Sequence, residues 1–95
     1  METTHISEFN HSSSNFHQSN QFCMKGILMA DEGLLKEALE NFNKAIEVNP
    51  NNHIAFFNRA TIKIDLGDLD GAKVDFNKFD LLTEKSSVNS TKFLL

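Results

Sequence analysis

The sequence predicts an all-α fold, in which two helix-turn-helix repeats stack as a short α-solenoid. Three observations support this prediction: an internal repeat with a period of 34 residues, apolar residues at helical spacing within each copy, and a glycine midway through each copy. Superimposing residues 19–52 on residues 53–86 gives eight identical pairs. These are Phe22 and Phe56, Asp31 and Asp65, Gly33 and Gly67, Leu35 and Leu69, Ala38 and Ala72, Phe42 and Phe76, Asn43 and Asn77, and Lys44 and Lys78.

Residues 1–19 come before the first repeat and are predicted to form a mostly disordered arm. The segment holds five serines and three histidines, and its only aliphatic side chain is Ile6. Such a composition buries too little apolar area to offset the conformational entropy lost on ordering. Phe9 and Phe16 are its only aromatic residues.

The repeats themselves occupy residues 20–85, and four helices are predicted there at about 20–32, 35–48, 53–66 and 69–83. Gly33 and Gly67 are expected in the turns between helices, because glycine adopts left-handed backbone conformations at little cost. Asp68 can cap the fourth helix, whereas its counterpart Leu34 cannot cap the second. The segment 49–52 ends the second helix, and either Asn51 or Asn52 can cap the third. Residues 86–95 form a tail, which could act as a cap on the repeats.

Composition and charge exclude several classes of function. The chain of 95 residues has a net charge of −4, and no stretch approaches 18 consecutive apolar residues. An acidic chain of this kind is not expected to bind nucleic acid, and no segment is expected to span a membrane. The first residues lack the features of a secretory signal, and the single cysteine, Cys23, cannot form an internal disulfide. We therefore expect a cytoplasmic protein.

Small and aromatic residues recur in both copies in a pattern that resembles the tetratricopeptide repeat. The first copy reads Phe22-x2-Lys25-Gly26-x2-Met29 and then Ala38-x3-Phe42 and Pro50; the second reads Phe56-x2-Arg59-Ala60-x2-Lys63 and then Ala72-x3-Phe76. The family pattern has W-x2-L-G-x2-Y, A-x3-F and P. Basic residues thus stand at the leucine position in both copies, and methionine or lysine stands at the tyrosine position. Small residues at 26, 38, 60 and 72 allow close helix contacts.

The resemblance implies a non-enzymatic module for protein–protein interaction, whose first helices line a concave groove for a peptide or protein. In this register the groove residues are Cys23, Met24, Ile27, Ala30 and Asp31 from the first copy, and Ile54, Phe57, Asn58, Thr61, Ile64 and Asp65 from the second. Some members of the family bind a chaperone's C-terminal carboxylate through lysine, arginine and asparagine. Only Asn58, in the second copy, matches that clamp, since Cys23 and Ile27 occupy the lysine and asparagine positions of the first copy and the sequence offers no third repeat. We do not expect chaperone-tail binding.

No arrangement of residues predicts catalysis, a metal or a cofactor. His5, His11 and His17 recur every six residues, which does not place them on one face of a helix or strand. The segment Asp68-x-Asp70-Gly71 lacks the outer ligands of a calcium loop. No nucleophile has an acid–base partner at a recognisable spacing.

Two repeats alone leave apolar side chains uncovered, because a solenoid generally needs about three repeats or polar caps. Phe57, Phe79 and Leu82 are among these side chains. They could be covered by the Phe93-Leu94-Leu95 tail, by the N-terminal arm or by a second copy of the chain. The alternative function is therefore that of a homo-oligomerisation element. Its apolar groove would be covered by a second copy of the chain, as in a homodimer, or by the chain's own tails.

Overall fold

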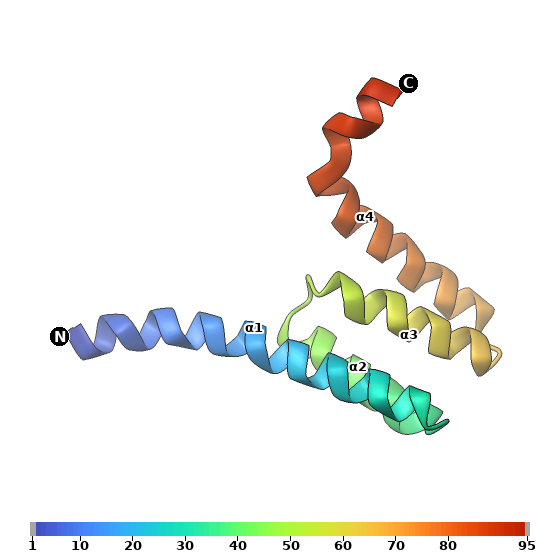
Figure 1. Ribbon diagram of the computed structural model, residues 1–95, viewed down its shortest axis with the longest axis horizontal. Coiled ribbons are helices and arrows are strands. Elements are labelled where there is room, and N and C mark those ends of the chain that lie inside the picture. The colour runs from blue at the N-terminus through green and yellow to red at the C-terminus, as the bar shows by residue number, and fades with distance from the viewer. Residues whose placement is uncertain (1, 95) are drawn as a thin grey trace.

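The structure is a computed structural model that describes the backbone of residues 2–94 and the side chains of residues 14–84. Its regular secondary structure, within residues 2–94, consists of four α-helices (Figure 1). They are α1 (Glu2–Asp31), α2 (Leu35–Val48), α3 (His53–Asp65) and α4 (Leu69–Leu94). The all-α fold class is confirmed.

The inner helix ends agree with the sequence prediction, whereas the outer ends of α1 and α4 do not. α1 begins at Glu2 rather than near residue 20, and α4 continues to Leu94 rather than ending near residue 83. Neither Gly nor Pro occurs within residues 2–25 or 72–94, so no strong helix-terminating residue stands in these stretches. The expected boundaries at residues 19–20 and 85–86 therefore do not coincide with helix ends.

The turns within the two hairpins repeat the same backbone geometry. Gly33 and Gly67 have φ angles of 81° and 87°, in the left-handed region that favours glycine. After α1, the amides of Gly33 and Leu34 donate to the carbonyls of Ala30 and Met29, and the second hairpin has the equivalent pair of bonds. This pair of hydrogen bonds provides partners for carbonyl groups at the end of the helix that would otherwise lack them.

The predicted capping differences between the helices are confirmed. Asn52 accepts a hydrogen bond from the Ala55 amide at the start of α3 (3.2 Å), and Asp68 accepts one from the Gly71 amide at the start of α4 (2.9 Å). Leu34 precedes α2 without a side-chain cap.

The apolar core lies where α1, α2 and α3 meet. It consists of Cys23, Ala38, Phe42, Ala45, Ala55 and Ile62. Phe42 is fully buried, and its ring packs against Gly26: a Cβ placed on Gly26 would lie 2.6 Å from Phe42 Cε1. Glycine is therefore required for the close approach of α1 and α2. α3 contacts each of the other three helices, whereas among the described residues α4 contacts only α3.

Buried hydrogen bonds connect the two hairpins beside this core. Ser19 Oγ donates to the carbonyl oxygen of Ala45 at 2.7 Å, and Asn52 Nδ2 donates to Ser19 Oγ at 2.8 Å. Ser19 is fully buried, although the sequence placed it at the edge of the arm. No buried side-chain nitrogen or oxygen within residues 14–84 lacks a hydrogen-bond partner.

Several sequence predictions concern side chains outside the described range. His5, His11 and Phe9 of the arm belong to this group, as does the tail 86–95 with Phe93-Leu94-Leu95. Phe16 is described, and its side chain is exposed.

Candidate functional site

The eleven residues that the sequence assigns to a groove all lie on α1 and α3, the two first helices of the hairpins. On each helix they recur at spacings that place them on one side. Six are exposed, four are half-buried and one is buried. We call the ten accessible residues the α1–α3 surface: Met24, Ile27, Ala30 and Asp31 on α1, and Ile54, Phe57, Asn58, Thr61, Ile64 and Asp65 on α3.

The buried residue is Cys23, whose side chain belongs to the core rather than to this surface. It is only 4% exposed and packs in the cluster that includes Ala55 and Ile62 of α3. Burial in this apolar environment raises the pKa of the Cys23 thiol, because desolvation disfavours the thiolate. The thiol is therefore neither a surface contact nor an activated nucleophile.

Both helices run in the same direction in Figure 1, so their C-terminal ends lie at the same end of the surface. Asp31 is the last residue of α1 and Asp65 is the last residue of α3. Between Ile54 and Asp65 the helical rise gives a surface about 16 Å long. Its apolar part includes three strongly exposed side chains: Met24 at 65%, Ile54 at 47% and Ile64 at 45%.

The two uncharged polar side chains of this surface, Asn58 and Thr61, are hydrogen-bonded to the backbone of their own helix. Asn58 Nδ2 donates to the carbonyl of Ile54 at 2.8 Å, and Thr61 Oγ1 donates to the carbonyl of Asn58 at 2.7 Å. The single hydroxyl proton of Thr61 is thereby used, so its oxygen can only accept a further hydrogen bond.

Phe57 is part of an aromatic cluster at the edge of the surface. Its ring centroid lies 5.4 Å from that of Phe76 and 5.1 Å from that of Phe79, both on α4, and Phe79 lies 5.9 Å from His53. Phe57 is nevertheless 43% exposed. It therefore contributes to the packing of α3 on α4 as well as to the accessible surface, a double role that the sequence assignment missed.

Comparison with the equivalent positions of the first repeat explains why the cluster of His53, Phe57, Phe76 and Phe79 is partly exposed to solvent. The four residues 34 positions earlier are Ser19, Cys23, Phe42 and Ala45, and all four are buried in the first hairpin. There, the covering residues are Ala55 and Ile62 of α3 and Asn52, which caps this helix. The second hairpin has no described helix in the corresponding place, since α4 contacts only α3 among the four helices.

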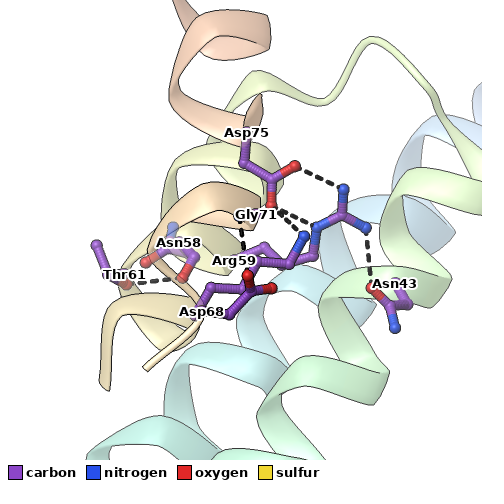
Figure 2. A network of polar contacts seen from close by, with 8 residues as sticks. Asn43, Asn58, Arg59, Thr61, Asp68, Gly71 and Asp75 are labelled. Carbon is purple, nitrogen blue, oxygen red and sulfur yellow. Dashed lines mark hydrogen bonds and ion pairs between the residues drawn. The ribbon is translucent and has the colours of Figure 1, made fainter. Parts of the chain in front are cut away.

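A second feature that the sequence did not reveal is an ionic network between α3 and α4. Arg59 binds Asp75 through two hydrogen bonds of 2.7 Å, and Lys63 Nζ lies 3.1 Å from Asp75 Oδ2. Arg59 Nη1 also donates to Asn43 Oδ1 on α2 at 2.9 Å (Figure 2). Three helices are thus joined through one guanidinium group.

Asp75 is only 1% exposed, yet it carries a charge. Burial raises the pKa of its carboxyl group, but hydrogen bonds and positive charge from Arg59 and Lys63 outweigh this effect and hold the pKa below its ordinary value. Arg59 and Lys63 stand where the tetratricopeptide pattern has leucine and tyrosine. Their basic character was a sequence signal that a carboxylate should lie nearby, although it does not say on which helix.

A pocket of about 530 Å³ opens beside the N-terminal end of the α1–α3 surface. It is lined by Phe16, Asn20, Asn49, Asn51, Asn52, His53 and Ile54. The pocket contains no aspartate, glutamate, lysine or arginine side chain. The acidic groups of the α1–α3 surface are therefore confined to its opposite end.

Within the described residues, no group of three or more His, Cys, Asp or Glu side chains is placed to hold a metal ion. None of the helices there combines the length and the apolar character required to cross a membrane.

Comparison with known proteins decides the family. Two tetratricopeptide repeat profiles match the chain, at residues 21–52 and at residues 41–74, and together they span more than half of it. The chain belongs to the tetratricopeptide repeat family. Its members are protein-interaction modules, and the fold and the period of 34 residues agree with this assignment.

Individual relatives include short and long proteins. An uncharacterized protein of Methanocaldococcus jannaschii is 37% identical over 62 residues, which are 65% of this chain and 72% of that protein. Tetratricopeptide repeat protein 36 of Danio rerio is 44% identical over 55% of this chain and 28% of its own length. Tetratricopeptide repeat protein 16 of Homo sapiens is 38% identical over 70% of this chain, but only 8% of its own length. No solved structure matches at a significant level.

Proposed function

We propose that this tetratricopeptide repeat chain is a non-enzymatic adaptor that binds a peptide or protein segment on its α1–α3 surface. The observation that carries the proposal is the exposure of Met24, Ile54 and Ile64 on the first helices of both hairpins. Large apolar side chains that gather on one surface usually mark an interface. A cytoplasmic location is part of the proposal, and it is supported by the single, buried thiol.

The proposal is tested by removing apolar contacts without disturbing the core. Met24→Gln and Ile64→Gln retain good helix formers at exposed positions, so helicity should be unchanged. Peptide ligands selected on the wild-type chain should lose about tenfold or more in affinity for the double variant. Isothermal titration calorimetry measures this loss.

Leu81→Gln is the matched control, because Leu81 is 60% exposed but lies on α4. Equal affinity for the wild type and the Met24/Ile64 variant would rule out the α1–α3 surface as the binding site.

Self-association is the second candidate function, and one observation favours it. Phe57, Phe76 and Phe79 are partly exposed in the second hairpin, whereas Cys23, Phe42 and Ala45 are buried at the equivalent positions of the first. A second copy of the chain would bury this aromatic cluster. Sedimentation equilibrium separates the candidates, since a concentration-independent monomer excludes the homodimer and a tight dimer sensitive to Phe79→Ala supports it.

A further inference from the structure

The α1–α3 surface has an unequal distribution of charge along its length. Asp31 and Asp65 are exposed at the C-terminal ends of α1 and α3, and none of the ten residues of the surface is basic. The pocket at the other end is lined by asparagines, a histidine and apolar side chains. A ligand lying along the surface therefore meets negative charge at one end only.

The two aspartates stand where helix electrostatics disfavours them. The C-terminus of an α-helix carries a partial negative charge, which lysine or arginine in the last turn would offset. The last turn of α1 contains no basic residue. The last turn of α3 contains Lys63, but its Nζ is 3.1 Å from Asp75 Oδ2. The stability of the helices therefore gives no reason for aspartate at these positions. Residues that depart from a local preference, here the preference for basic side chains at helix C-termini, commonly have a functional role.

The hydrogen-bonding groups of the surface favour the same kind of ligand as its charge does. The Asp31 and Asp65 carboxylates are acceptors when ionised, and Thr61 Oγ1 has already used its proton within α3. Asn58 has also committed one donor hydrogen to its own helix. The C-terminal half of the surface mainly offers acceptors, so a ligand that supplies donors fits it best.

From these observations we infer that the partner of the α1–α3 surface is a peptide segment with apolar side chains along most of its length and lysine or arginine at one end, which lies against Asp31 and Asp65. This inference rests on the proposed function and adds the chemistry and orientation of the ligand. The apolar residues of the segment contact Met24, Ile54 and Ile64. Cationic groups at its end pair with the two carboxylates and with the partial negative charge of two helix ends.

A selection from random 12-residue peptides displayed on phage tests the inference, using the full chain as bait. The probe length suits a surface about 16 Å long, which accommodates about eleven helical or five extended residues. Enriched peptides should combine apolar residues with an excess of lysine and arginine at one end. The same selection is repeated on the double variant Asp31→Asn/Asp65→Asn and on the control Asp80→Asn, an exposed aspartate of α4.

The double variant should lose the basic excess, and the best wild-type peptide should bind it about 3- to 20-fold more weakly, as expected for two exposed ion pairs. Asp80→Asn should retain the excess and the affinity. Raising the salt concentration should weaken wild-type binding more than binding to the double variant. Because removal of the aspartates relieves an unfavourable helix-end charge, the double variant should be at least as stable as the wild type by circular dichroism.

The outcomes separate the inference from the proposed function. Peptides that are apolar but lack a basic end, and that still depend on Met24 and Ile64, would overturn the inference and leave the proposed function standing. A basic excess that survives in the double variant would also overturn the inference. Failure to enrich any peptide above bare support would overturn both.

Discussion

At the scale of single residues, Asp75 links the stability of the chain to pH. Its folded-state pKa lies below the ordinary value of an aspartate, so folding favours the ionised form. The unfolded chain then binds more protons in acid than the folded chain does. The stabilisation from Asp75 is fully present above the unfolded pKa, about 4, and is lost as pH falls through the lower folded-state value.

Replacement of Asp75 by asparagine should therefore destabilise the chain at pH 7 and make its free energy of unfolding less dependent on pH in the acid range. Removing one partner of a buried ion pair leaves the other charges uncompensated, at a cost of about 3 kcal/mol. Urea unfolding at pH 7 and at pH 3, followed by circular dichroism, measures both effects. The wild type and Asp75→Asn should differ most at pH 7 and converge in acid. A constant difference across this range would show that the carboxylate charge is not the source of the stabilisation.

At the scale of the helix, Gly26 controls how closely α1 approaches α2. A methyl group at this position would lie 2.6 Å from Phe42 Cε1, a distance that requires the ring or the helix to move. Gly26→Ala should therefore lower the free energy of unfolding by about 1–3 kcal/mol, although alanine is the better helix former.

The decisive control changes the ring instead of the helix. In a Phe42→Leu background the space beside residue 26 is larger, so Gly26→Ala should become neutral or stabilising. Thermal melts of the wild type, the two single variants and the double variant give the coupling energy. Simple additivity of the two changes would mean that Phe42 is not the group that excludes a side chain at position 26.

The inner helix ends could be predicted because their causes are local in sequence. Gly33 and Gly67 supply the left-handed turns, and Asn52 and Asp68 supply the caps. The outer ends of α1 and α4 could not be predicted in this way, since no glycine, proline or capping pattern marks them.

The surface was predictable only in part, for a reason that belongs to tertiary structure. Helical spacing assigned the ten residues of the α1–α3 surface to one side of two helices, and the structure has these residues on α1 and α3. Periodicity cannot say which helix covers a given side chain, so Cys23 and Phe57 received the same assignment although one is 4% and the other 43% exposed. Prediction of the Arg59–Asp75 ion pair would have required knowledge of which side of α3 packs against α4.

At the scale of the whole molecule, stability depends on whether the two hairpins unfold together. In repeat proteins it is set by each repeat and by the contacts between neighbours. Here the contacts include a shared core and two polar links, the Asn52–Ser19 bond and the Arg59–Asn43 bond. Cys23 reports on the first hairpin, since its thiol is buried and its raised pKa suppresses the reactive thiolate.

We expect thiol exposure at Cys23, followed with a chromogenic disulfide reagent, to coincide with the loss of helicity during urea unfolding. Asn52→Ala should shift both transitions to lower urea by removing the α3 cap and leaving Ser19 with one partner fewer, at a cost of about 2 kcal/mol. Asn58→Ala is the control, because the recorded hydrogen bond of Asn58 stays within its own helix and is exposed. If Cys23 reacted at urea concentrations where helicity is intact, the first hairpin would open independently, and the core shared by α1, α2 and α3 would not be what holds the chain together.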